Sequence, residues 1–288
     1  MSDADYNVAV GYGSLSSDNK GNKSVALGYG TLGNQKITTI TDTHNTAVGH
    51  SAGSEITTGF QNTIVGSMAG DALTDADYNV AIGYSALTTD TKGSKTVAIG
   101  RSALESQNLT TSTDSLNVAV GYLTGSNLTT GPHHPAVGTH SLIGVVTGTG
   151  NSCYGLESGN SITSGAYNTF IGRYTADSCT TGSYNTQLGN DTDVSAADVQ
   201  FAVAIGHSAV DKGTNTGFIT PTSGVYQGNN NASWSTTSDI RIKKNITDNN
   251  IGLDTINQIQ VKNFEYRTED EIVDFDNPKA AVVEKEGI

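Results

Sequence analysis

A glycine-centred hexad recurs through the first 210 residues of this chain at a nearly fixed spacing. It reads NVAVGY at residues 7–12, NVAIGY at residues 79–84 and NVAVGY again at residues 117–122. The step is 17 residues everywhere except from Gly28 to Gly49 and from Gly100 to Gly121, where it is 21. A fixed period of this size predicts a repeat architecture. The twelve central glycines are Gly11, Gly28, Gly49, Gly66, Gly83, Gly100, Gly121, Gly138, Gly155, Gly172, Gly189 and Gly206.

Each hexad has the pattern of a short β-strand. The residue before the glycine is Val, Ile or Leu in every copy except Tyr154, and Ala lies one position earlier in eight copies. This alternation of β-branched and small residues is typical of strands. We expect the larger side chains to line an internal core and the alanine face to let another surface approach. One repeat is too poor in apolar side chains to fold alone, so stacked repeats must share a core.

The predicted fold is therefore all-β, a parallel β-roll or β-solenoid of about twelve 17-residue repeats. A series of β-hairpins in a sandwich is the alternative, but hairpins rarely keep one register through twelve copies. The central glycine permits a positive φ or a close backbone approach where each strand ends. Asn lies four residues before the glycine in eight copies, where its amide can bond backbone groups and form a ladder. The two longer steps carry insertions at residues 35–43 and 107–115, which we expect to protrude.

Composition excludes several functional classes. The net charge of −13 argues against binding to nucleic acid. No apolar run is long enough to span a membrane. Cys153 and Cys179 lie at different phases of the repeat, so neither a disulfide framework nor a zinc site is implied. The calcium-binding nonapeptide and the phosphate-binding glycine loop are also absent. We therefore expect no cofactor and no metal.

Three histidines lie close together around one repeat turn. His133, His134 and His140 from three chains on a common axis could bind a metal ion. Histidines in a turn are more often solvated, and we expect these to be so.

Four tyrosines follow their central glycines at the same phase, namely Tyr12, Tyr29, Tyr84 and Tyr122. They form either an exposed aromatic stripe for glycan or partner contact, or a packing contact between turns or subunits.

The composition changes twice after the repeats. Residues 1–210 form the repeat array and residues 211–237 a connector. In residues 238–288 charged residues become dense and glycine nearly disappears. There Leu253, Ile256 and Ile259 would share a helical face, and residues 261–267 alternate as a strand does. We expect a small α+β piece with too few apolar residues for an independent core.

The hexads together resemble the head repeats of trimeric autotransporter adhesins, which also occur in phage fibres. In that family each chain is a left-handed parallel β-roll and three rolls form one rod. The resemblance implies an intertwined homotrimer. No coiled-coil stalk or membrane-anchor barrel follows the repeats in this sequence.

Residues 238–246 (SDIRIKKNI), 252–257 (GLDTIN) and 261–266 (VKNFEY) resemble the opening of the intramolecular chaperone domain of phage tail spikes and endosialidases. Such a domain trimerises, guides fibre assembly and then cuts itself off. By this resemblance Ser238 is the nucleophile, Lys243 its general base and Thr237–Ser238 the scissile bond. A desolvated lysine can take the proton of a serine hydroxyl. From spacing alone, Ser238 can equally cap a turn while Lys243 is a solvated charge.

Together these features indicate a structural phage tail-fibre protein that contacts a receptor. The expected partners are two further copies of the chain, other virion tail proteins and a host-surface receptor, for which a glycan is a candidate. Its enzymatic activity would be at most a single-turnover self-cleavage by a Ser–Lys dyad. The alternatives are the head of a bacterial trimeric surface adhesin and a self-cleaving serine peptidase as the main activity. The first places the protein in the virion, and the adhesin alternative on the bacterial surface.

Overall fold

The computed structural model describes residues 3–220, 225–228 and 235–236. The chain divides into two compact units, residues 1–238 and 239–288. The second unit lies outside the described residues, and with it the predicted α+β piece. All regular structure in the described part is β-strand, so it contains no helix with the length and apolar character needed to cross a membrane.

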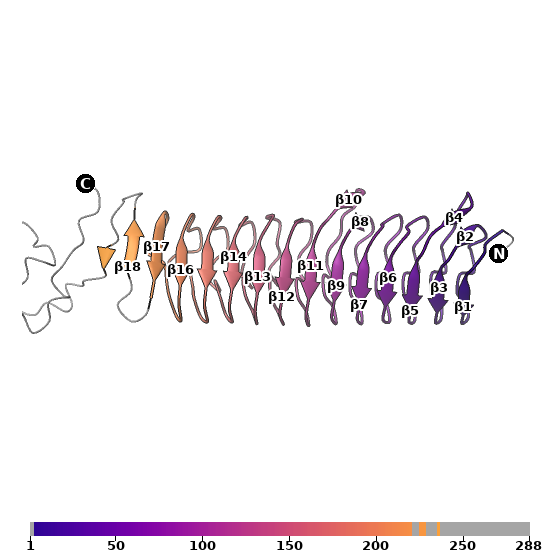
Figure 1. The fold of residues 1–288 in the computed structure, drawn as a ribbon, viewed down its shortest axis with the longest axis horizontal. Helices are drawn as coiled ribbons and strands as arrows, with labels where there is room; N and C mark the ends of the chain where they lie inside the picture. Colours follow the sequence, from indigo (N-terminus) through magenta and orange to yellow (C-terminus); the bar gives the residue numbers. More distant parts are fainter. Residues whose placement is uncertain (1–2, 221–224, 229–234, 237–288) are drawn as a thin grey trace, which may run out of the picture. The chain divides into compact units, whose positions relative to one another are not determined.

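Fifteen short strands form one sheet in which the spatial order follows the sequence. From β1 to β17 every neighbouring pair is parallel, and residues of equal phase lie side by side, as Ala81 and Ala98 do. Figure 1 shows these strands stacked along one axis. The last two strands pair antiparallel and end the parallel series. The strands are β1 (Val8–Val10), β3 (Val25–Leu27), β5 (Thr46–Val48), β6 (Thr63–Val65), β7 (Val80–Ile82), β9 (Val97–Ile99), β11 (Val118–Val120), β12 (Pro135–Val137), β13 (Ser152–Tyr154), β14 (Thr169–Ile171), β15 (Thr186–Leu188), β16 (Val203–Ile205), β17 (Thr216–Ile219), β18 (Val225–Gly228) and β19 (Ser235–Thr236).

The predicted fold class is confirmed, since the repeats form a parallel β-solenoid of about twelve turns with 17-residue spacing. Positions within a turn are counted from its central glycine, which is position 0. The central glycines have φ between 128° and 142°. At Gly83 a Cβ atom would overlap the carbonyl oxygen of Gly100 in the next turn. The glycine is therefore required both by its backbone conformation and by the close approach of the neighbouring turn.

The predicted assignment of the strand faces was wrong. The alanines at position −2 point into the solenoid and are buried, whereas the Val, Ile and Leu residues at positions −3 and −1 point outward. Ala81 is fully buried, but Val10 and Leu27 are 54% and 45% exposed. One coil of 17 residues encloses little space, so the strand contributes a small side chain. The volume is filled from the opposite wall by leucines at position +4 and aliphatic residues at position +7.

Side-chain volumes compensate where a turn departs from this scheme. Position −2 is Ile64 in β6 and Phe170 in β14, and both are fully buried. The facing +4 positions are then glycines instead of leucines. A Cβ atom at Gly53 would lie 3.0 Å from Ile64 Cδ1, and one at Gly159 would lie 3.1 Å from Phe170 Cδ2. The core therefore keeps its packing density although the residue at each level changes.

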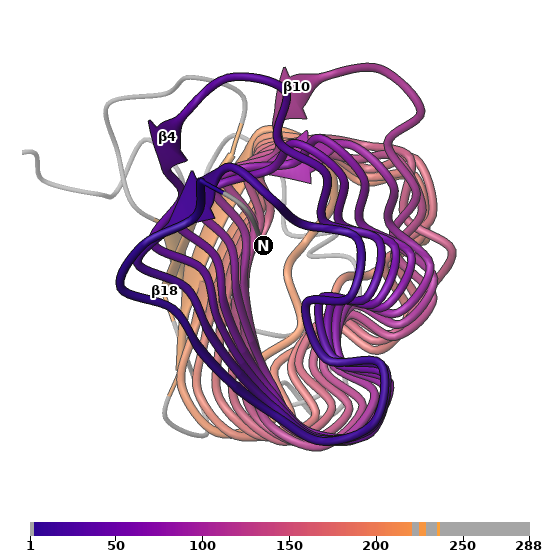
Figure 2. The same cartoon turned by 90° about the vertical axis from the view of Figure 1, so that its right-hand side faces the viewer.

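The two insertions protrude from the shaft, as predicted, and each adds a small parallel sheet (Figure 2). The first pairs β2 (Gly21–Asn22) with β4 (Thr41–Asp42), and the second pairs β8 (Gly93–Ser94) with β10 (Thr113–Asp114). Gln35 and Gln107, which were predicted to begin the protruding loops, are instead fully buried at their bases.

Candidate functional sites

The predicted catalytic pair, Ser238 and Lys243, lies outside the described residues, and so does the scissile bond Thr237–Ser238. The last described strand, β19, ends at Thr236, one residue before Thr237. Self-cleavage therefore stays a prediction. The functional features that the structure does position are all in the solenoid.

The outer face of the main sheet is an apolar ribbon that runs the length of the shaft. It consists of positions −3 and −1, and we call it the outer sheet face. None of these positions in the twelve turns carries Asp or Glu, although the chain has 28 such residues. The two flanking columns, positions −5 and +1, also lack acidic residues. The Val, Ile and Leu side chains of the outer sheet face are Val8, Val10, Val25, Leu27, Val48, Val65, Val80, Ile82, Val97, Ile99, Val118, Val120, Val137, Ile171, Leu188, Val203 and Ile205.

Aromatic ladders border this face on both sides. At position +1, Tyr12 stacks on Tyr29 with centroids 5.4 Å apart, and Tyr29 stacks on His50 at 5.1 Å. At position −5, Tyr184 stacks on Phe201 at 4.8 Å, close to the spacing of paired strands. The tyrosines predicted from the sequence are thus both exposed and packed between turns, which combines the two alternatives.

A ladder of asparagines runs inside the solenoid at position −4. Asn62 illustrates its geometry: Oδ1 accepts the N–H of Asn79 at 2.9 Å, and Nδ2 donates to the carbonyl oxygen of Ala76 at 2.8 Å. Asn62 is 1% exposed, so these bonds replace the water that its amide loses. The predicted Asn ladder is confirmed.

His134 occupies an asparagine position in this ladder. It is 1% exposed. Its Nδ1 accepts the N–H of Asn151 at 3.1 Å, and Nε2 lies 3.1 Å from the carbonyl oxygen of Gly148. A backbone N–H can only donate, so Nε2 carries the proton and the ring is neutral. Burial lowers the pKa of His134 below its usual value.

The expectation of three solvated histidines was therefore wrong for His134, because its phase in the repeat, position −4, places it among the buried asparagines. His133 is exposed, and His140 lies half-buried with Nδ1 3.9 Å from Glu157 Oε1. Within residues 3–220 no three His, Cys, Asp or Glu side chains gather as a metal site. Cys153 and Cys179 are buried thiols, and burial raises the pKa of Cys179 to about 12, which makes it inert at neutral pH.

A buried carboxylate holds the base of each insertion. In the second one, Gln107 Nε2 donates to Asp90 Oδ2 at 2.5 Å, while Asp90 Oδ1 accepts the N–H groups of Leu109 and Gly93 at 2.9 and 3.1 Å. Burial raises the pKa of Asp90, and these hydrogen bonds oppose the rise. Asp18 and Gln35 repeat the pair 72 residues earlier. These buried pairs could have been found from the sequence, because the four residues are polar at position +7, where other turns carry aliphatic side chains.

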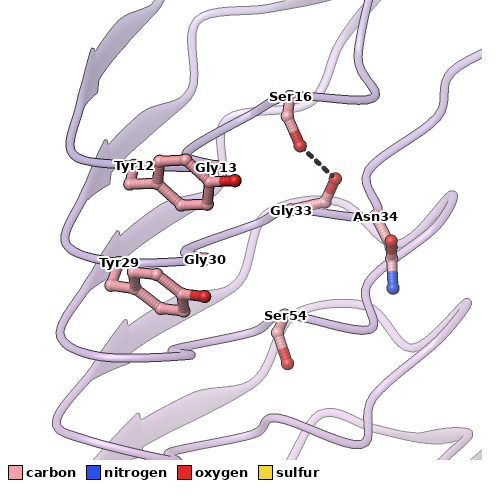
Figure 3. Close-up of a pocket in the computed structure, with 8 residues that line it drawn as sticks. All are labelled: Tyr12, Gly13, Ser16, Tyr29, Gly30, Gly33, Asn34 and Ser54. Atoms are coloured by element: carbon pink, nitrogen blue, oxygen red, sulfur yellow. Dashed lines mark hydrogen bonds between the residues drawn. The ribbon is translucent and has the colours of Figure 1, made fainter.

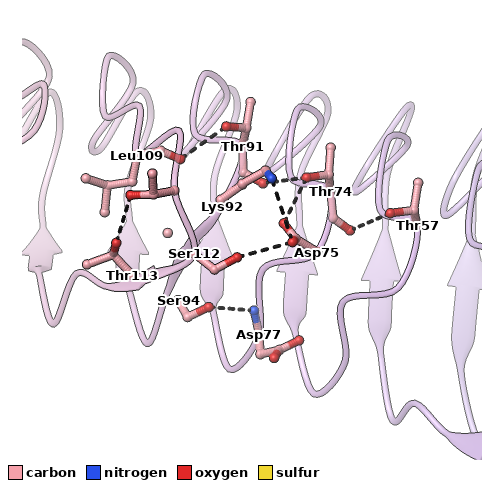
Figure 4. A network of polar contacts seen from close by, with 12 residues as sticks. Thr57, Thr74, Asp75, Asp77, Thr91, Lys92, Ser94, Leu109, Ser112 and Thr113 are labelled. Carbon is pink, nitrogen blue, oxygen red and sulfur yellow. Dashed lines mark hydrogen bonds and ion pairs between the residues drawn. The ribbon is translucent and has the colours of Figure 1, made fainter.

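The second insertion folds back over earlier turns (Figure 4). Ser112 Oγ donates to Asp75 Oδ2 at 3.2 Å, and Lys92 Nζ lies 3.9 Å from the same oxygen. Beneath it, hydroxyls at position +8 link successive turns, as Thr74 Oγ1 does by donating to the carbonyl oxygen of Thr91 at 3.0 Å. The loop is thus attached to the shaft surface at Asp75, two turns before its own.

A groove of about 230 Å³ opens beside the first tyrosines of the +1 ladder. Figure 3 shows the rings of Tyr12 and Tyr29 on one side and Ser16, Asn34 and Ser54 along the other. Three glycines complete the lining, so its floor is largely backbone. The tyrosines were predicted from the sequence, whereas the groove was not.

Comparison with known proteins bears on the region after the solenoid. Residues 238–280 match a protein family described as "Chaperone of endosialidase". No curated protein and no solved structure matches the chain. The match begins at the predicted nucleophile, Ser238. The chaperone match and the β-solenoid together fit the resemblance found in the sequence, that of a tail-fibre-like protein with the start of an endosialidase-type intramolecular chaperone.

Proposed function

We propose that three copies of this chain form a phage tail-fibre shaft that contacts a host receptor, with their outer sheet faces turned toward a common axis. The observation that carries the proposal is the acid-free apolar ribbon. In a chain of net charge −13, an exposed face of this length without a carboxylate suits contact between identical copies. Each half-exposed Val or Ile that becomes buried stabilises the assembly by about 1 kcal/mol. Over twelve turns this burial makes a large favourable contribution to the free energy of association.

The flanking ladders fit the same arrangement. A three-fold interface is heterologous, so the edge of the outer sheet face at position −5 of one chain would meet the edge at position +1 of the next. The side of Tyr12 and Tyr29 that faces positions +5 and +6 would stay open. Both columns are rich in aromatic residues and contain cations, among them Arg101, whose guanidinium lies 5.7 Å from the Tyr84 ring centroid. Aromatic and arginine side chains are enriched in protein interfaces.

The C-terminal region would guide this assembly and then be released. Lys243 Nζ takes the proton of Ser238 Oγ, which attacks the carbonyl carbon of Thr237. The peptide bond between Thr237 and Ser238 breaks, and an ester forms between the Thr237 acyl group and Ser238 Oγ. Water hydrolyses the ester, leaving a carboxylate on Thr237 and a free amine on Ser238. Each chain can do this once, so the protein is not a turnover enzyme. The family match favours this phage assignment over a bacterial adhesin head.

Sedimentation equilibrium of the purified chain tests the assembly. We expect a mass near three times 29.8 kDa for the uncut chain. A stable monomer at micromolar concentration would contradict the proposal.

A further inference from the structure

The groove beside Tyr12 and Tyr29 exists because two turns have glycine where the other ten have a side chain. Position +2 is Gly13 and Gly30 in the first two turns. Their φ angles are 71° and 65°, and the residues at the same position in the other turns also have positive φ, between 51° and 56°. The backbone at this position therefore accepts an L-residue throughout the shaft. Those residues are Ser51, Met68, Ser85, Ser102, Leu123, His140, Glu157, Tyr174, Asp191 and Ser208.

Close packing does not require the two glycines either. A Cβ atom at Gly13 would lie 3.7 Å from its nearest neighbour, Gly30 Cα, and one at Gly30 would lie 3.8 Å from Ser51 Oγ. Both are ordinary van der Waals distances. The central glycines differ, because a Cβ atom at Gly28 would overlap the Gly49 carbonyl group. What Gly13 and Gly30 provide is open space at the surface.

The chemistry of the lining is neutral and mixed. Tyr12 and Tyr29 are 79% and 54% exposed. Because Tyr12 stacks on Tyr29 and Tyr29 stacks on His50, they turn ring edges and hydroxyl groups toward the groove. On the other side, the hydroxyls of Ser16 and Ser54 donate to the carbonyl oxygens of Gly33 and Asp71 and can still accept hydrogen bonds. The Asn34 amide uses one N–H to donate to Glu55 Oε2 at 3.0 Å and keeps its oxygen as an acceptor. An amide both donates and accepts hydrogen bonds, as hydroxyls do. None of the lining residues is charged, although Asp, Glu, Lys and Arg make up 15% of the chain.

We propose that this groove binds a neutral hexopyranose unit of a host-surface polysaccharide. A pyranose ring offers C–H groups to the tyrosines and several hydroxyls to the Ser and Asn side chains. The volume of about 230 Å³ lies below the range of drug-sized pockets and suits one sugar ring. An anionic sugar would meet no cation in the groove and a chain of net charge −13. The inference deepens the receptor-contact part of the proposed function and rests on it.

Saturation-transfer NMR on the full-length chain with a panel of neutral methyl hexopyranosides tests the assignment. We expect at least one sugar to receive saturation from tyrosine ring protons. Gly13→Ser and Gly30→Ser fill the groove with a residue that other turns carry at the same φ, so the fold persists, as circular dichroism would verify. Each should weaken the sugar's Kd by at least tenfold.

Ser85→Gly, which removes the position +2 side chain beside Tyr84, is the matched control and should leave binding unchanged. If no sugar of the panel binds, or if the filled variants bind as the wild type does, the assignment is wrong. If the filled variants change the sedimenting mass instead, a neighbouring chain occupies the groove and the sugar site is refuted. Sugar binding by a monomer would contradict the trimer and leave the groove assignment intact, so the two proposals fail separately.

Discussion

His134 gives the asparagine ladder an acid-sensitive position. The ring accepts a hydrogen bond from the N–H of Asn151 and donates one to the carbonyl oxygen of Gly148, and only the neutral imidazole can do both. A proton on Nδ1 would point at the N–H of Asn151 and leave that buried donor unpaired. Protonation in the folded state is therefore opposed both by burial and by the loss of a hydrogen bond, and burial is the main cause of the lowered pKa.

The sign of the pH dependence follows from linkage. The pKa of His134 lies below its usual value in the folded chain, whereas the unfolded chain has the ordinary value of about 6.5. Between these two values the unfolded chain binds more protons. The stabilising contribution is therefore complete above about pH 6.5 and is lost as the pH falls through this window. Within it the free energy of unfolding drops by up to about 1.4 kcal/mol per pH unit for each chain.

His134→Asn is the matched variant, because it restores the residue that eight other turns carry at this position. Its amide would accept from Asn151 and donate to Gly148, as Asn62 does with its own neighbours. Urea unfolding of both proteins from about pH 7.5 to about pH 5 isolates the effect, since His133 and every carboxyl group are common to both. We expect the wild type to lose stability more steeply, by up to about 1.4 kcal/mol per unit. Parallel profiles would show that His134 does not act as inferred.

Three further predictions concern the turn, the two strand faces and the processing site. Gly83→Ala should lower the free energy of unfolding by about 3 kcal/mol, since its Cβ atom would overlap the next turn, as thermal melts would measure. Ala81→Asp places a charge in the core and should unfold the shaft locally, which would appear as increased hydrogen exchange of β7. Ile82→Asp places the charge on the outer sheet face, so the circular dichroism spectrum should stay that of a β protein while the sedimenting mass shifts toward the monomer. If Ile82→Asp unfolds the chain and Ala81→Asp does not, the two faces are misassigned. Ser238→Ala should leave the chain uncut on a denaturing gel, and a mutant still cut at Thr237 would exclude Ser238 as the nucleophile.

The periodic features of this fold could be predicted because each arises from one residue type at one phase. The glycine at position 0 and the asparagine at position −4 have backbone roles that do not depend on the rest of the core. The insertions followed from the two longer steps in the same way. These predictions needed only the count of residues between copies.

The orientation of the strands could not be predicted, because alternation is symmetric. It shows that Ala81 and Ile82 point to opposite sides but not which side is interior. That choice depends on the space inside one coil and on the side chains of the opposite wall, where the leucines at position +4 fill that space. The face with the larger apolar side chains is also the one that an assembly interface needs. The usual expectation that large apolar residues lie inside the chain was therefore misleading.

His134 and the groove were not predicted because each is recognised only by comparing the same position across all turns. His134 was considered with its sequence neighbours, whereas its position in the repeat places it among buried asparagines. Gly13 and Gly30 are two of 34 glycines, and they stand out only beside the residues that occupy position +2 in the other turns. The processing site, Ser238 with Lys243, lies outside the described residues, so its assignment still rests on sequence.

In the proposed assembly the outer sheet faces of three chains meet along the shaft. A spin label attached through Ile82→Cys measures this directly, because the native thiols of Cys153 and Cys179 are buried and resist labelling. We expect short label-to-label distances within each particle, and longer ones for a label at Thr57→Cys on the opposite wall. If the Ile82 label shows no intermolecular distance, or a longer one than the Thr57 label, the faces do not meet and the proposed assembly is wrong.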